Sequence, residues 1–128
     1  MGYVYANPNP KKRNANDCVV RAIALASNKS WEEVYMDITY QGLMMYDMPS
    51  SNGTWEKYLK DQGYVKRLIP DVCPECYTVK DFCNDFPIGQ YILATGSHVL
   101  YSEMGDYFDT SDSGNEILSY YFTKLKLD

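Results

Sequence analysis

The sequence has little positive charge and only one histidine. Its 12 basic and 17 acidic side chains give a net charge of −5, so no global basic field is present to attract nucleic acid. The local basic run Lys11-Lys12-Arg13 is accompanied by no second basic cluster or aromatic platform, and we interpret it as a solvated face. We therefore predict no nucleic-acid partner.

Long apolar runs are also missing. None approaches the roughly 20 residues that span a bilayer, and residues 7–13 are all polar or proline where a signal peptide would need an apolar core. We expect no membrane partner and a cytoplasmic location, where four cysteines are thiols rather than a disulfide framework. A chain of 128 residues suits one domain, residues 1–128, with an extended arm over residues 1–13.

Helical patterns occupy the first half of the chain and strand patterns the second. Helices are expected from Cys18, from a capping box at Ser30, and from Thr54 after a methionine-rich loop over residues 42–53. A further helical turn or two follows Thr78. Strands are expected over residues 64–69, 90–95, 98–102, 107–109 and 117–124. This order predicts an α+β fold, with N-terminal helices packed on a C-terminal antiparallel sheet of about four strands.

Cys18 lies where a polar loop runs into the first, largely apolar helix, with Asn16 or Asp17 as the expected N-cap. A thiol on the first turn faces the positive end of the helix dipole and unpaired backbone N–H groups. Both favour the thiolate, which is the nucleophilic form. Because a free cysteine is more often a small buried hydrophobe, the position alone does not assign a role.

A base and an acid follow in suitable places in the second half. A cysteine nucleophile needs a base within hydrogen-bond reach, and the base needs a third group to orient it. In a hairpin centred on Met104-Gly105, His98 faces residue 110 or 111, so that Asp109 lies within a diagonal step of the imidazole. Asp112 lies near the same level and is the alternative acid, although Asp109 is favoured because it lies inside the regular strand.

The order of cysteine, histidine and acid along the chain resembles that of the papain-like cysteine peptidases. Three motifs contribute to the resemblance: Asn-Asp-Cys-Val-Val-Arg-Ala-Ile, Gly-Ser-His-Val-Leu and Tyr-Phe-Asp-Thr. The chain is similar to the bacteriocin-processing branch and to small uncharacterised papain-like proteins of phages and bacteria, over roughly residues 14–110. The resemblance implies a papain-like fold with Cys18 as nucleophile, His98 as base and Asp109 as orienting acid. The family usually carries an oxyanion-binding glutamine a few residues before the cysteine. Lys12 occupies that place here, so Asn14 and Asn16 are the candidate donors.

The expected function is thiol-dependent hydrolysis of a peptide, isopeptide or amide bond in a peptide or protein substrate, without a cofactor. One alternative is an inactive papain-like scaffold that binds a protein partner through its tyrosines, for example a phage-encoded inhibitor of a host factor. Another is a transferase that passes the acyl group to an amine. The sequence makes no prediction of oligomeric state.

A second cysteine group comprises Cys73, Cys76 and Cys83. A C-x-x-C pair is half of a structural zinc site, which needs four ligands. No second pair is present, and His98 is assigned to the triad. We favour packing cysteines over a zinc site or a redox pair, and predict no bound metal.

Overall fold

The computed structural model describes residues 2–69 and 77–124. Its elements in chain order are β1 (Tyr3–Tyr5), α1 (Cys18–Ser27), α2 (Trp31–Met45), α3 (Asn52–Asp61), β2 (Tyr64–Leu68), α4 (Val79–Asp85), β3 (Gln90–Thr95), β4 (Val99–Glu103), β5 (Asp106–Asp109) and β6 (Leu118–Lys124). The α+β class is confirmed. The sheet differs from the prediction, because six strands pair in the order β1-β5-β4-β3-β6-β2.

Strands β1 and β2 lie at the two edges of the sheet; β2 lies where a strand is expected, whereas β1 is not expected from the sequence. Strands β3, β4 and β5 form an antiparallel meander, β6 returns beside β3, and β2 pairs antiparallel with β6. At the other edge β1 pairs parallel to β5, with Tyr3 opposite Tyr107, so the sheet is mixed and the antiparallel prediction is wrong for this edge. The expected arm over residues 1–13 therefore contains a strand. Its three residues are too few to show an alternating pattern, and the open edge of β5 supplies their hydrogen bonds.

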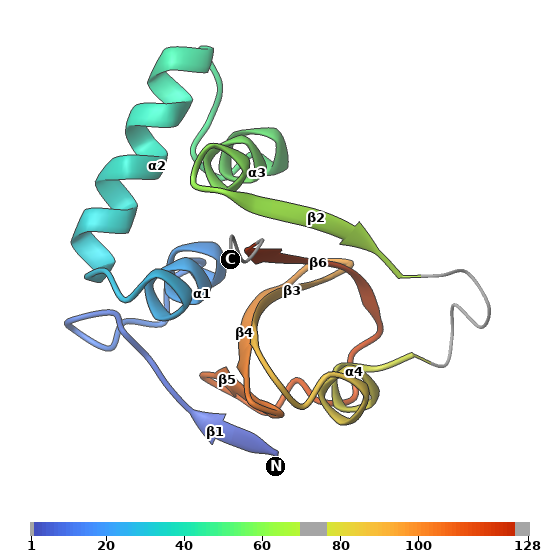
Figure 1. Cartoon of the computed structure of the whole chain (residues 1–128). Coiled ribbons are helices and arrows are strands. Elements are labelled where there is room, and N and C mark those ends of the chain that lie inside the picture. The colour runs from blue at the N-terminus through green and yellow to red at the C-terminus, as the bar shows by residue number, and fades with distance from the viewer. Residues whose placement is uncertain (1, 70–76, 125–128) are drawn as a thin grey trace.

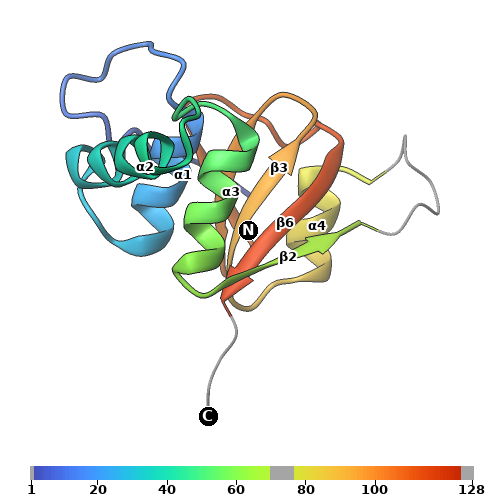
Figure 2. The same cartoon turned by 90° about the horizontal axis from the view of Figure 1, so that it is seen from above.

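Both faces of the sheet are covered by helices. Helices α1 and α3 pack on one face, with α2 outside them, and α4 lies on the concave face (Figures 1 and 2). Successive side chains of β3 point to opposite faces of the sheet. Ile92 and Ala94 face the core formed with α1 and α3, and Leu93 faces α4. In this arrangement α1 packs directly against β3 and β4, and the turn between these two strands forms one side of the candidate site.

Helix α2 is longer than predicted, because Gly42 does not end it. A Cβ atom at Gly42 would lie 2.7 Å from the backbone oxygen of Asp47, so glycine is required there for close packing inside the helix. The helix ends at Tyr46, which adopts a left-handed φ of 55°. Helix α3 begins at Asn52 rather than at Thr54. Of the predicted methionine-rich loop over residues 42–53, residues 42–45 thus belong to α2 and residues 52–53 to α3, and residues 46–51 connect the two helices.

Candidate functional site

Cys18 is the first residue of α1, with Asp17 as its N-cap. The first-turn amides of a helix have no carbonyl partner one turn earlier, so they are available to an anion beside the thiol. Cys18 is half-buried and lies on the wall of a cavity of about 300 Å³. The helix is central and rigid, since Ala22 and Ile23 on its core side are almost completely buried.

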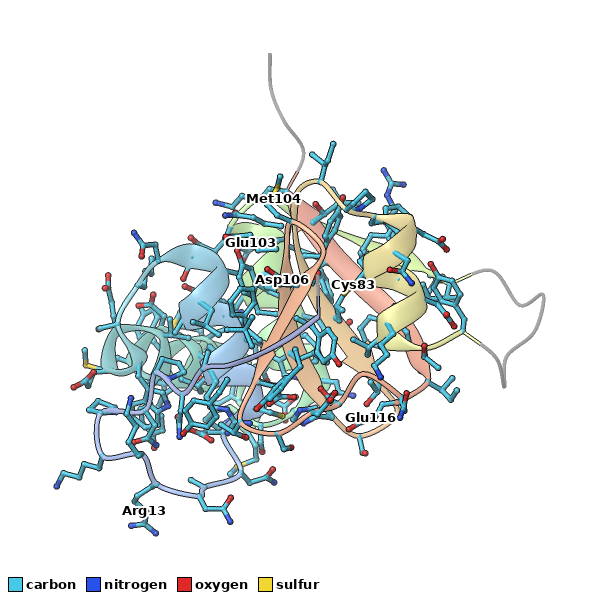
Figure 3. All side chains as sticks on the ribbon, turned by 90° about the horizontal axis from the view of Figure 1, so that it is seen from below. Arg13, Cys83, Glu103, Met104, Asp106 and Glu116 are labelled. Atoms are coloured by element: carbon cyan, nitrogen blue, oxygen red, sulfur yellow. The ribbon has the colours of Figure 1, made fainter. Side chains whose placement is uncertain are left out.

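His98 is held by the turn between β3 and β4. The backbone N–H of Thr95 donates to the His98 carbonyl oxygen at 2.9 Å, and the Thr95 hydroxyl approaches the same oxygen at 3.4 Å. The Thr95 hydroxyl also donates to Glu116, which lies in the loop before β6 (Figure 3). Because α1 packs on β3 and β4, this turn carries His98 to the start of α1.

Asp109 is the acid that contacts His98. In the β4–β5 hairpin Ser102 lies opposite Tyr107, which agrees with the register that the sequence predicts. The hairpin brings Nε2 of His98 to 2.5 Å from Oδ2 of Asp109. The buried carboxylate also accepts from the Ser113 hydroxyl and from the Thr110 backbone N–H, both at 2.8 Å.

The alternative acid, Asp112, has different partners. Its carboxylate accepts from the Tyr107 hydroxyl at 2.6 Å and from the Gly114 backbone N–H at 3.0 Å. The Tyr107 hydrogen bond is the main cause that lowers the pKa of Asp112. Asp112 therefore closes the loop after β5, and the geometry assigns the contact with His98 to Asp109.

The electrostatics of the three groups favour an ion pair. Burial opposes ionisation of Cys18, but hydrogen bonds from the His98 side chain and the Val99 backbone, with the charges of His98 and Arg21, lower the pKa of its thiol overall. The hydrogen bond to Asp109, then that to Cys18, raises the pKa of His98 to about 10. Burial also opposes ionisation of Asp109, yet its hydrogen bonds to His98 and Ser113 lower its pKa. These shifts favour the thiolate form of Cys18, the imidazolium form of His98 and the carboxylate form of Asp109.

Arg21 is a site residue that the sequence interpretation missed. Its buried guanidinium pairs with Asp17, and Nη2 lies 3.7 Å from Oδ1 of Asp109. Asp17 also accepts from Trp31 Nε1 at 2.9 Å and from Asn9 Nδ2 at 3.2 Å. Arg21 thus links Asp17, the N-cap of the helix that begins at Cys18, to Asp109. The Asp17–Arg21 spacing on an otherwise apolar helix was the available signal, because a buried cation needs a partner.

The two candidate oxyanion donors lie in different places. Both asparagines are exposed, but only Asn16 lines the cavity beside Cys18, and Asn14 is not part of the cavity lining. Lys12, at the place of the family's glutamine, is exposed and donates to the Asn7 carbonyl oxygen at 2.5 Å. Asn16 is therefore the candidate whose position suits an oxyanion donor.

The cavity lies between two sides of the fold. The β3–β4 turn and the start of α1 form one wall, and α2 with the start of α3 forms the other. Its lining is mostly apolar away from the cysteine and includes Val19, Ile38, Trp55 and Tyr120. A pocket that presents reactive groups at one end and apolar surface beyond them can take an uncharged side chain next to a reacting carbonyl.

No family model, curated protein or solved structure matches the chain. The resemblance to papain-like peptidases is therefore an expectation from the sequence motifs.

The second cysteine group is only partly described. Cys83, on the side of α4 that faces the sheet, is buried, and its Sγ lies 3.5 Å from the Ser102 hydroxyl (Figure 3). Burial raises the pKa of its thiol, as expected for a packing cysteine. Cys73 and Cys76 lie outside the described residues. Within residues 2–69 and 77–124, no group of three or more His, Cys, Asp or Glu residues could hold a metal ion. No helix in these same ranges has both the length and the apolar character to cross a membrane.

Proposed function

We propose that the chain is a papain-like thiol hydrolase that cleaves a peptide, isopeptide or amide bond. The observation that carries the proposal is the set of Cys18 and His98 on the wall of the cavity, with the buried Asp109 bonded to His98. A lone thiol or histidine would not favour catalysis over packing. A thiol of lowered pKa, beside an imidazole that a buried carboxylate orients, is the arrangement that acyl transfer requires.

The first half-reaction forms a thioester. The Cys18 thiolate attacks the substrate carbonyl carbon, and the carbonyl π electrons move to oxygen. The backbone N–H of Cys18 and the Asn16 amide are the donors available to that oxyanion. Nε2 of His98 is bound to Asp109, which leaves Nδ1 for the thiol and for the departing amine. As the carbonyl re-forms, the C–N bond breaks and His98 protonates the leaving nitrogen.

The second half-reaction releases the acid. His98, now neutral, takes a proton from water as the water oxygen attacks the thioester carbonyl. Collapse of the second tetrahedral intermediate expels the Cys18 thiolate and yields the carboxylic acid. Asp109 holds the imidazole in one tautomer and orientation throughout, and Arg21 holds Asp109.

A test needs no natural substrate, because an activated ester can serve as the acyl donor. With p-nitrophenyl acetate we expect a burst of p-nitrophenolate, an acetylated Cys18 peptide in the mass spectrum, and slower turnover. Cys18→Ala should abolish both the burst and the adduct. Cys83→Ala is the matched control, because that thiol is buried with a raised pKa, and it should retain both.

The outcomes separate the alternatives. Acetylation that is discharged by water supports a hydrolase, and acetylation discharged only when an amine is added overturns hydrolysis in favour of a transferase. If Cys18 in the folded protein acquires no acetyl group, the catalytic proposal is wrong and an inactive scaffold replaces it.

A further inference from the structure

Helix α2 is apolar on its outward side as well as on its core side. Val34, Ile38 and Gly42 face the core and are buried. On the opposite side Met36, Tyr40 and Leu43 are 62%, 63% and 65% exposed. Their spacing of four and three residues places them on one stripe of the helix. We call these three residues the outer stripe.

The outer stripe lies on the side of the molecule farthest from the sheet. Figure 1 shows α2 as the outermost helix, with α1 and α3 between it and the strands. The apolar surface continues past the end of the helix, since Met44, Tyr46 and Met48 are also exposed. Scattered exposed apolar side chains are normal, but a contiguous stripe of large ones marks an interaction surface.

The charges around the stripe select the kind of partner. Asp37 of α2 is paired with Lys29 at 3.3 Å and accepts from the Tyr58 hydroxyl at 2.9 Å. The other acidic groups are Glu32 and Glu33 in the first turn and Asp47 after the last turn, and the helix carries no lysine or arginine. A second copy of the chain would bring these acidic groups together across the contact, and an anionic membrane surface would repel them. A polypeptide that carries lysine or arginine beside its apolar side chains is complementary to both features.

The stripe is also continuous with the candidate site. Tyr35 and Thr39, on the neighbouring line of α2, belong to the cavity lining that includes Cys18. A segment lying along α2 would therefore run beside the cavity mouth and place the rest of its chain next to the thiol.

We propose that the outer stripe is a docking surface for a basic amphipathic helix of a protein partner, which would lie along α2 with its apolar residues on Met36, Tyr40 and Leu43. Helix-on-helix packing suits the four-and-three spacing, because such rows form the ridges that interdigitate between helices. The proposal goes beyond the chemistry of Cys18 and does not depend on it.

The test uses two synthetic helical peptides with the same leucine stripe, one carrying lysine and the other glutamate at the polar positions. Binding to the full chain is measured by calorimetry, for the wild type and for Cys18→Ala. The triple variant Met36→Gln, Tyr40→Gln, Leu43→Gln removes the stripe. The matched control changes three exposed apolar residues elsewhere to Gln: Leu68, Ile88 and Met104.

We expect the lysine peptide to bind wild type and Cys18→Ala alike, the glutamate peptide to bind far more weakly, and the stripe variant to lose about tenfold or more in affinity. The control variant should bind as the wild type does. Equal binding of the lysine peptide by both triple variants would overturn the proposal. So would a stripe-dependent dimer in sedimentation, which would identify a second copy as the occupant, or stripe-dependent binding to neutral or anionic lipid vesicles.

Discussion

The substitution Asp109→Asn probes the candidate triad through protein stability and its pH dependence. The amide keeps the shape of the carboxylate but removes the charge that faces His98 at 2.5 Å and Arg21 at 3.7 Å. Removing one member of a buried ion pair is expected to lower the free energy of unfolding by about 3–5 kcal/mol. The shift in the pKa of His98 gives a similar limit. A rise in the His98 pKa from 6.5 to about 10 corresponds to about 5 kcal/mol from all its causes, of which Asp109 is the first.

The loss should depend on pH in a definite direction. The folded pKa of His98 lies above its unfolded value, so its stabilising contribution is complete below the unfolded pKa of about 6.5 and disappears as the pH rises through about 10. The difference in unfolding free energy between wild type and Asp109→Asn should therefore be largest near about pH 6 and should shrink towards about pH 10. Urea unfolding followed by tryptophan fluorescence measures this difference in unfolding free energy. Both tryptophans report on the folded state, since Trp55 is buried and Trp31 donates to Asp17.

Asp112→Asn is the matched control for this experiment. Asp112 is an exposed neighbour whose pKa is lowered, so any stability that it adds is lost only at acidic pH. Its substitution should leave a small, constant difference over the same pH range. A pH-independent loss in Asp109→Asn, or the same pH-dependent loss in both variants, would refute the assignment of Asp109 as the partner of His98.

Three other predictions test the surroundings of the site. Arg21→Met should raise the pKa of Cys18, measured as the midpoint of its alkylation rate against pH, because the arginine charge lowers that pKa. Arg21→Lys keeps the charge and should retain most of the effect. Identical alkylation profiles for the two variants would contradict this prediction. Asn16→Ala should slow thioester formation by about two orders of magnitude while Asn14→Ala leaves it unchanged, and burst kinetics distinguishes the two. Gly42→Ala should destabilise the protein by about 1–3 kcal/mol, since the new Cβ meets backbone oxygen at 2.7 Å. Gly53→Ala, in open space within α3, should stabilise it by about 0.5–1 kcal/mol in the same thermal melt.

The part of the site that depends on short-range geometry follows from the sequence. His98 directly precedes β4 and Asp109 ends β5, and the turn at Met104 and Gly105, both at positive φ, fixes how these two strands face each other. The start of α1 is equally local, since a polar loop runs directly into an apolar helix at Cys18. These features need only the spacing of residues and the period of each element.

The features that the sequence did not reveal depend on contacts distant in the chain. β1 is a strand because β5 offers an open edge more than a hundred residues later, as the bond from Tyr107 N to the Gly2 oxygen at 3.0 Å illustrates. Gly42 resembles a helix stop until the close approach of Asp47 is known. Arg21 resembles a surface cation until two carboxylates from different elements are seen around it. The i,i+4 spacing indicates Asp17 as one partner of Arg21, but propensity and pattern contain no information about the approach of Asp109, of Asp47 or of β5.

We propose that His98 keeps Cys18 as a reactive thiolate. The most direct measurement is the rate of iodoacetamide alkylation of Cys18 against pH, read from the Cys18 peptide by mass spectrometry, in wild type and in His98→Ala. An unstructured thiol gives a midpoint at about pH 8.5. We predict a wild-type midpoint below that value, because the pKa of Cys18 is lowered, and a midpoint above it in His98→Ala, where burial acts with less opposition. Coinciding midpoints in the two proteins, or a wild-type midpoint equal to that of the unstructured thiol, would contradict the claim.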